Sequence, residues 1–201
     1  GRDERLAAWP RPAEDVRSQL AEYYGLITHM DARIGDLLDA LERNGLTENT
    51  IVIFAADNGL ALGSHGLLGK QSLYEHSTHV PLIIAGPGIQ SGSSDALVVL
   101  YDLFPTISTL TGFEMPGGVD GHDLTDLMRG DSDGPRDVLY TTFQNIHRAV
   151  RDDRWKLIRY PRIDRIQLFD LENDPFEMND LSSDTTYTDQ VNRLMPIMVV
   201  E

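Results

Sequence analysis

The run TIVIFAA at residues 50–56 constrains the fold most, because it is short, almost entirely apolar and rich in β-branched side chains. Such a run is typical of a strand that is buried on both faces of a parallel sheet. A second run of this kind, VPLIIAG, follows at residues 80–86. Upstream, apolar residues recur at three- and four-residue steps from Glu14 to Asn44, which predicts a long amphipathic helix that stops at Gly45. A long helix leading into buried strands predicts an α/β sandwich with helices on its faces.

The character of the sequence changes after the run DSDGP at residues 131–135, which has the composition of a linker. Beyond it, short strand-like runs follow one another closely, and the pair Asp152-Asp153 separates two of them as a hairpin turn would. Consecutive strands with tight turns predict an antiparallel sheet, and a terminal helix is expected near residues 187–198. We therefore expect an α/β domain over residues 1–135 and a small β-rich subdomain over residues 136–201.

The charge balance excludes some classes of partner. The 201 residues include 17 Lys and Arg against 32 Asp and Glu, which gives a formal net charge of −15. A polyanion such as nucleic acid would be repelled at long range, so we expect no nucleic-acid partner. An enzyme acting on a small anion would need local positive charge from a metal ion or from Lys and Arg. No apolar run approaches the roughly 18 residues of a membrane span, so none is expected. The absence of Cys removes disulfides, zinc thiolates and a Cys nucleophile.

The loop after the first strand, DNGLALGSHGLLGK, carries the side chains with the most chemistry. Asp57 and Asn58 offer a carboxylate and an amide oxygen at the place where open α/β sheets bind ligands. Oxygen ligands suit hard cations such as Ca²⁺ or Mg²⁺, but a calcium site needs about six to eight of them, and the rest would come from elsewhere. The alternative is a plain turn, in which Asp and Asn bond to their own backbone and Gly59 takes a positive φ.

Lys70 and three histidines lie in or near the same loop. Lys70 is expected to precede a short helix at residues 71–76, where its ammonium and the backbone N–H groups would face one anion. The alternative is a solvated surface lysine. His65, His76 and His79 invite a zinc interpretation, because imidazoles are common zinc ligands and His76 and His79 are three positions apart, but no third nitrogen ligand has an obvious place. A histidine such as His65 is more plausible as a hydrogen-bond or proton donor near an anion.

Several separated segments, in order, resemble the C-terminal half of a sulfatase of the alkaline phosphatase-like superfamily. They are YYGLITHMDARIGDLLDALERNGLTENTIVIFAADNG, GSHGLLGKQSLYEHSTHVPLIIAGPG, LYDLFPTISTLTG with GVDGHDL, and RAVRDDRWKLIRYP with QLFDLENDPFEMNDL. The resemblance implies that residues 1–135 are the C-terminal portion of the α/β catalytic domain. Residues 136–201 would then be its small antiparallel β-rich C-terminal subdomain.

The resemblance also implies roles for residues of the loop. Asp57 and Asn58 would be the second pair of ligands to a catalytic divalent cation, usually Ca²⁺ in this family, with Mg²⁺ as the alternative. Lys70 would be the catalytic lysine that contacts the sulfate group, and His65 would line the substrate pocket or serve the structure. The formylglycine nucleophile would come from the missing N-terminal half, because no Cys or Ser of this chain lies in the required motif. The isolated chain is therefore expected to be inactive.

The implied function is a sulfuric ester hydrolase acting on a sulfated small molecule or sugar, with the N-terminal half of the same protein as a partner. A phosphodiesterase or phosphonate monoester hydrolase of the same superfamily is one alternative, and a non-catalytic module is another. The N-terminus, GRDERLAAWPRP, has neither an initiator Met nor an apolar signal region, so a piece of a longer chain is expected. A periplasmic or secreted location is compatible with the family, while the compartment and the oligomeric state are not fixed by the sequence. The segment RYPRIDRIQ is rich in Arg and would suit an acidic sugar, with a solvated hairpin as the alternative.

Overall fold

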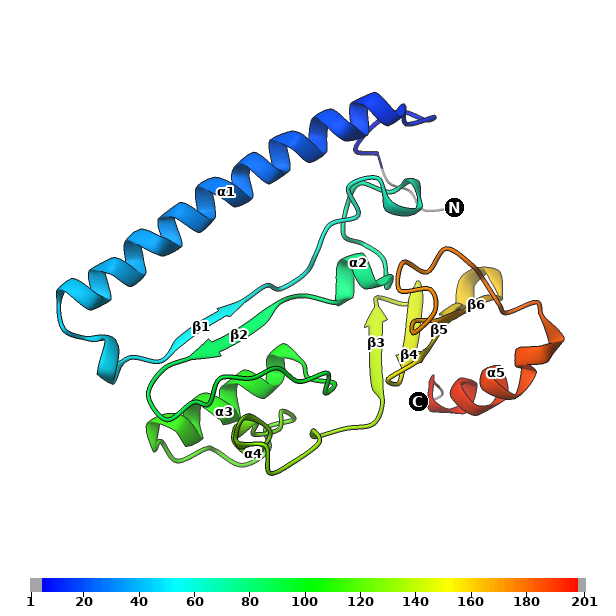
Figure 1. Cartoon of the computed structure of the whole chain (residues 1–201). Helices are drawn as coiled ribbons and strands as arrows, with labels where there is room; N and C mark the ends of the chain where they lie inside the picture. The colour runs from blue at the N-terminus through cyan, green and yellow to red at the C-terminus, as the bar shows by residue number, and fades with distance from the viewer. Residues whose placement is uncertain (1–4, 199–201) are drawn as a thin grey trace. The chain divides into compact units, whose positions relative to one another are not determined.

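The computed structural model describes residues 5–198 (Figure 1), and the chain divides into two compact units. Unit 1 comprises residues 1–71 and 76–88, and unit 2 comprises residues 72–75 and 89–201. The predicted domain boundary after residue 135 falls within unit 2, and that domain division stays a prediction.

Unit 1 begins with helix α1 (Ala13–Arg43), a continuous helix of 31 residues (Figure 1). The predicted stop is confirmed, because Gly45 has a φ of +65° and its N–H donates to the carbonyl oxygen of Glu42 at 2.9 Å. This left-handed conformation costs glycine little. No residue of α1 is buried among the described residues, so its apolar stripe is uncovered there. Within the same part of the chain, no helix is long and apolar enough to cross a membrane.

Strands β1 (Val52–Ala55) and β2 (Leu82–Ala85) form the two-stranded sheet of unit 1. The pairing is antiparallel, with Val52 opposite Ala85 and Ala55 opposite Leu82, so the predicted parallel arrangement is wrong for this pair. Parallel neighbours need a long crossover, usually a helix. Residues 56–81 instead fold into a compact loop and the four-residue helix α2 (Glu75–Thr78), which returns the chain alongside β1 in the opposite direction.

The predicted burial of both strands is also wrong within the described residues. All four residues of β1 are only half-buried, and β2 alternates between half-buried and exposed positions. Ile83, for example, is 59% exposed. A two-stranded sheet offers two open faces, so its apolar side chains stay accessible until further structure covers them.

Unit 2 combines short helices with a four-stranded antiparallel sheet. The strands run in the order β3 (Leu139–Phe143), β4 (His147–Arg151), β5 (Trp155–Tyr160) and β6 (Arg165–Asp170). Three helices accompany them: α3 (Leu103–Thr111), α4 (Thr125–Arg129) and α5 (Thr188–Leu194). The predicted antiparallel sheet, the turn at Asp152-Asp153 between β4 and β5, and the helix near residues 187–198 are all confirmed.

Both faces of this sheet carry a core. On one face, Val150 and Leu157 pack with Leu194 and Met198 from α5 and the turn that follows it. The other face carries a second cluster made of Leu73, Ala149, Ile158, Phe169 and Leu171. Side chains alternate along a strand, which is how neighbouring residues of β4 and β5 reach different cores.

A buried charge cluster ties the segment 72–75 to this sheet. Lys156 is 2% exposed, and its Nζ lies 2.9 Å from a carboxylate oxygen of both Glu75 and Glu177. Arg151 pairs with Glu75 at 2.8 Å, and the Glu75 N–H donates to Glu177 at 2.6 Å. Burial raises the pKa of the Glu177 carboxyl even though Lys156 acts to lower it. Together with the packing of Leu73, these contacts explain why residues 72–75 belong to unit 2 although their neighbours in sequence belong to unit 1.

Candidate functional site

Asp57 and Asn58 follow β1 with one residue, Ala56, between, close to their predicted place at the end of the strand. Asp57 is exposed, and its Oδ1 accepts a hydrogen bond from the Asn58 N–H at 2.9 Å. The Asn58 side-chain amide donates to the carbonyl oxygen of Gly59 at 3.1 Å. These local contacts use the backbone N–H and the side-chain NH2 of Asn58. They do not use its Oδ1, an acceptor with two lone pairs that can bind other groups.

Gly59 shows why the chain turns here. It has no positive φ, so the simple turn interpretation is wrong on that point. A Cβ atom at this position would lie 2.0 Å from the carbonyl oxygen of His76. The Gly59 N–H also donates to the carbonyl oxygen of Ser77 at 3.1 Å. The glycine is therefore required by a close approach to the backbone of α2, which fixes the position of the Asp57-Asn58 pair relative to that helix.

Lys70 joins this pair through its side chain. Its Nζ donates to Asn58 Oδ1 at 2.8 Å, although the two residues are 12 positions apart in sequence. The predicted helix over residues 71–76 is wrong, because α2 begins only at Glu75. The burial of Leu73 in the core of unit 2 holds the intervening residues outside a helix. Lys70 is therefore not at a helix N-terminus, whose N–H groups could have helped it to bind an anion. Its role depends on its proximity to Asn58.

The chemistry of these three side chains is that of a site for charged groups. The ammonium of Lys70 is itself a cation held by Asn58 Oδ1, so this oxygen is accessible to positive charge. A divalent cation and an ammonium side by side would repel each other unless an anion lay between them. The arrangement therefore suits a cation and an oxyanion bound together.

The side-chain oxygens of Asp57 and Asn58 are the type of ligand that a hard cation binds, but two residues supply too few of them. Ca²⁺ takes about six to eight oxygens, and Asp57 and Asn58 together supply only part of that set. Among residues 5–198, no group of three or more His, Asp or Glu side chains is placed to hold a metal ion. The remaining ligands of a calcium or magnesium ion would come from outside this set of residues.

His65 lies in a loop that closes on itself through backbone hydrogen bonds. The N–H of Ala61 donates to Gly69 at 3.0 Å, and that of Gly63 donates to Leu67 at 2.7 Å. His65 has a φ of +53°, a conformation that is uncommon for a residue with a side chain. Its ring centroid lies 5.7 Å from that of His76, so two of the three histidines considered for zinc lie close together.

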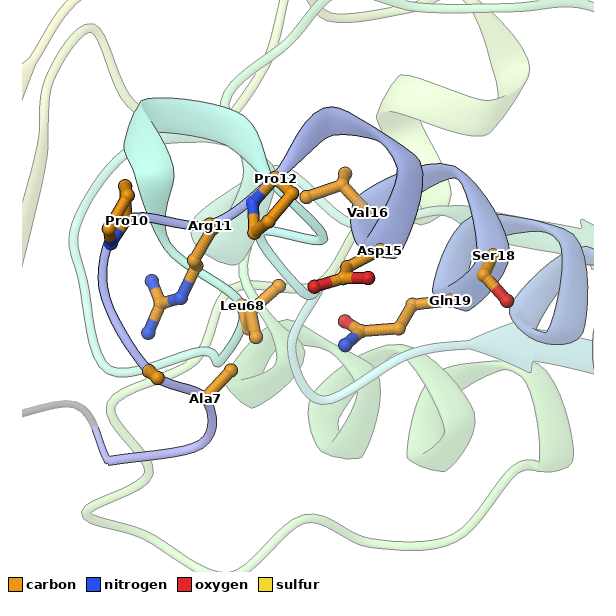
Figure 2. A pocket seen from close by; sticks show the side chains of 10 residues that line it. Ala7, Pro10, Arg11, Pro12, Asp15, Val16, Ser18, Gln19 and Leu68 are labelled. Carbon is orange, nitrogen blue, oxygen red and sulfur yellow. The ribbon is translucent and has the colours of Figure 1, made fainter.

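A pocket of about 430 Å³ lies in unit 1 between the segment before α1, the first turns of α1 and Leu68 (Figure 2). Arg11 crosses this region: it donates to the carbonyl oxygen of Gly66 and lies 4.5 Å from the centre of the Trp9 ring. The pocket is lined by none of the four predicted site residues, which are Asp57, Asn58, His65 and Lys70. The pocket and the predicted site are therefore separate sets of residues.

Two family models match the chain. The model described as Sulfatase matches residues 3–113, and the model described as N-sulphoglucosamine sulphohydrolase, C-terminal, matches residues 63–199. The choline-sulfatase of Rhizobium meliloti (strain 1021) is 34% identical over 175 residues, which cover 84% of this chain and 34% of that protein. The chain thus spans about a third of the length of the curated relatives that it matches.

Solved structures agree with the sequence matches. One is a protein in complex with its substrate D-glucosamine-2-N,6-O-disulfate, with a TM-score of 0.76 and 30% identity over 86% of this chain and 38% of that one. The phosphonate monoester hydrolase of Silicibacter pomeroyi has a TM-score of 0.82 and 27% identity over 92% of this chain and 41% of that one. These similarities confirm the predicted α/β fold class, with its antiparallel C-terminal subdomain. Each of the two family models matches more than half of the residues. The chain therefore belongs to the sulfatase family.

Proposed function

We propose that the complete protein hydrolyses sulfate esters to an alcohol and sulfate, and that this chain supplies part of the metal and sulfate site. One observation in a sulfatase-family chain carries this proposal: the Lys70 ammonium contacts Asn58 Oδ1 at 2.8 Å, directly beside Asp57. The contact brings one base to one of two neighbouring oxygen ligands, and these are the kinds of group needed to hold an oxyanion against a cation.

The three residues share two tasks in this proposal, cation binding and sulfate binding. Asp57 and Asn58 hold a divalent cation through their side-chain oxygens, with Ca²⁺ as the expected ion and Mg²⁺ as the alternative. A cation bound there supplies positive charge to the oxygens of the sulfate group. Lys70 donates to a sulfate oxygen and offsets the negative charge that develops on the transferring group. Such local positive charge is necessary in a chain whose net charge is −15.

The nucleophile is expected from the N-terminal half of the same protein, as a formylglycine residue. This half would be the partner of the present chain, and the 201 residues alone would be inactive. His65 would line the substrate pocket, because its loop follows the Asp57-Asn58 pair and ends near Lys70 in sequence.

The substrate class that we favour is a sulfated sugar or a sulfated small molecule. Choline-sulfatase is among the similar proteins, and another similar protein has D-glucosamine-2-N,6-O-disulfate as its substrate. Both relatives act on a sulfate group carried by a small polar molecule, according to their names.

A phosphonate monoester hydrolase is the second candidate. The TM-score of 0.82 to such an enzyme from Silicibacter pomeroyi equals the TM-score to a 2-O GAG sulfatase. Sulfate and phosphonate esters both present a charged tetrahedral group, so a cation and a lysine would bind either one. The activity of the complete protein separates the two.

The test is to assay the complete protein on an aryl sulfate and on an aryl phosphonate monoester, with and without Ca²⁺. We expect calcium-dependent sulfate release. Asp57→Ala and Lys70→Ala should each lower kcat by about 100-fold or more, the usual effect of removing one group that stabilises developing charge. Arg43→Ala and Glu48→Ala, exposed charge changes elsewhere in unit 1, are the controls.

Two results would contradict the proposal. One is hydrolysis of the phosphonate with no release of sulfate. The other is turnover within about twofold of wild type in both site variants, a difference of only about 0.4 kcal/mol in the activation barrier.

A further inference from the structure

Three arginines at one end of the β3–β6 sheet have no part in the proposed sulfate site. Arg148 of β4 and Arg159 of β5 are directly opposite each other in the antiparallel ladder. Opposite residues in such a ladder have Cα atoms about 4.5–5.5 Å apart, and like charges at these positions destabilise the sheet. We call Arg148, Arg159 and Arg162 the arginine cluster.

The opposed pair lies on the face of the sheet that α5 covers. Because side chains alternate, Arg148 shares its face with Val150, and Arg159 shares its face with Leu157. Val150 and Leu157 are fully buried under Leu194 and Met198. The two arginines are half-buried, and they form the next row of the sheet, beyond that core.

Arg162 lies at the same end of the sheet. It follows β5 in the short turn Pro161–Ile163, and it is exposed. Its guanidinium donates to the side-chain oxygen of Asn145, in the turn between β3 and β4. β4 begins at this end and β5 ends there, so the turn that carries Arg162 and the opposed pair are neighbours.

The arginine cluster is also distinguished by its lack of ion pairs. No carboxylate of residues 5–198 forms an ion pair with any of the three. Every other Lys or Arg of unit 2 has a carboxylate oxygen within 4.0 Å; they are Arg129, Arg136, Arg151, Arg154, Lys156, Arg165 and Arg193. In a chain with 32 acidic and 17 basic residues, the bases of this unit that lack an acidic partner are gathered in one place.

We propose that the arginine cluster binds a sulfate or carboxylate group of a sulfated oligosaccharide. This inference rests on the proposed function, in which the substrate carries sulfate on a sugar. Two adjacent guanidinium groups can hold one oxyanion through paired N–H donors, which relieves their mutual repulsion. Arg162 would contact a further anionic group along the glycan.

The size of the arginine cluster favours a short glycan over nucleic acid. Proteins that bind nucleic acid through the backbone make many phosphate contacts, about six to ten in strongly salt-dependent cases. Three arginines in a chain of net charge −15 cannot supply such a surface, but they match one or two anionic groups.

The experiment measures binding of a heparin-derived tetrasaccharide to the complete protein by calorimetry at several salt concentrations. The double variant Arg148→Ala/Arg159→Ala should bind the tetrasaccharide at least about 10-fold more weakly, with a smaller dependence on salt. Hydrolysis of a small aryl sulfate, which carries a single anionic group, should stay within about twofold of wild type. Arg33→Ala/Arg129→Ala removes two exposed, ion-paired arginines and should change neither quantity.

Several outcomes would overturn the inference. One is an unchanged affinity in the folded double variant. Another is an equal affinity of the wild type for an uncharged tetrasaccharide, which has neither sulfate nor carboxylate groups. A third is displacement of the heparin-derived tetrasaccharide by a DNA oligonucleotide at similar concentration. If the double alanine variant unfolds, Arg148→Gln/Arg159→Gln is compared in its place, because glutamine keeps part of the aliphatic stem and a polar end without the charge. Failure of the wild type to release sulfate from any ester would overturn the proposed function, whereas tetrasaccharide binding would still decide the role of the arginine cluster.

Discussion

At the scale of single residues, Gly59 links the predicted metal ligands to α2. A Cβ atom there would meet the carbonyl oxygen of His76 at 2.0 Å, and a backbone atom cannot move aside as a flexible side chain can. We therefore expect Gly59→Ala to displace the Asp57-Asn58 pair. The variant should lose about 1–3 kcal/mol of stability, the usual cost of overpacking.

The measurement combines thermal unfolding of the complete protein with its calcium-dependent sulfate release. Gly92→Ala is the control, because a Cβ atom at Gly92 would meet nothing within 4 Å. A Gly59→Ala variant with wild-type Tm and wild-type turnover would show that the close approach to α2 has no role in holding the site.

At the scale of elements, Asp102 joins three parts of unit 2. It is fully buried, and its two carboxylate oxygens accept from Arg136 at 2.6 and 2.7 Å. They also accept from the N–H groups of Val99 at 2.8 Å and His122 at 2.9 Å. One side chain therefore connects the start of α3, the loop before α4 and the segment that leads to β3.

The environment of Asp102 predicts an acid-sensitive contribution to stability. Burial acts to raise its pKa, but the hydrogen bonds from Arg136, His122 and Val99 outweigh burial, and the pKa lies below its usual value. A depressed pKa means that the folded state favours the carboxylate. The contribution is thus complete above the usual pKa of about 4 and is lost as the pH falls through the folded-state value.

Denaturant unfolding of the complete protein between pH 3 and pH 7 tests this expectation. Asp102→Asn should cost about 3–5 kcal/mol at neutral pH, because it leaves the mostly buried Arg136 without its carboxylate. The difference between wild type and variant should shrink as the pH falls below about 4. A difference that is constant over the whole range would rule out ionised Asp102 as the source.

The elements also show which features a sequence can predict. Helix α1 and the β3–β6 sheet follow from local patterns, since periodicity, Gly45 and the Asp152-Asp153 turn determine them within short segments. The direction of β2 and the start of α2 depend on distant packing, such as the burial of Leu73 against the C-terminal sheet.

The same distinction applies to the candidate site. Asp57 and Asn58 could be placed after β1 because they are adjacent to the strand in sequence. The close approach of Gly59 to the backbone of His76 depends on how the intervening residues fold, and it was not predicted. Lys70 was connected to the pair by family resemblance, and its hydrogen bond to Asn58 gives that connection a physical basis.

At the scale of the whole molecule, the 201-residue chain presents apolar surface that its own described residues do not cover. No residue of α1 is buried, and Tyr24, Leu26 and Leu37 are 60%, 68% and 62% exposed. The β1–β2 sheet has two strands, fewer than independent stability usually needs, and it offers edges that can pair with other chains. We therefore expect the chain, expressed alone, to self-associate, with sedimentation velocity showing species that grow with concentration.

A surface variant makes this expectation specific. Leu26→Lys/Leu37→Lys places charge on the apolar surface of α1 and should reduce self-association. The control Glu14→Lys/Glu22→Lys changes exposed acidic positions of the same helix and should leave self-association unchanged. Addition of the proposed N-terminal half should also suppress the larger species, because that half would compete for the same apolar surface. A monodisperse monomer of the wild-type chain at all concentrations would mean that the exposed residues of α1 are tolerated in water without a partner.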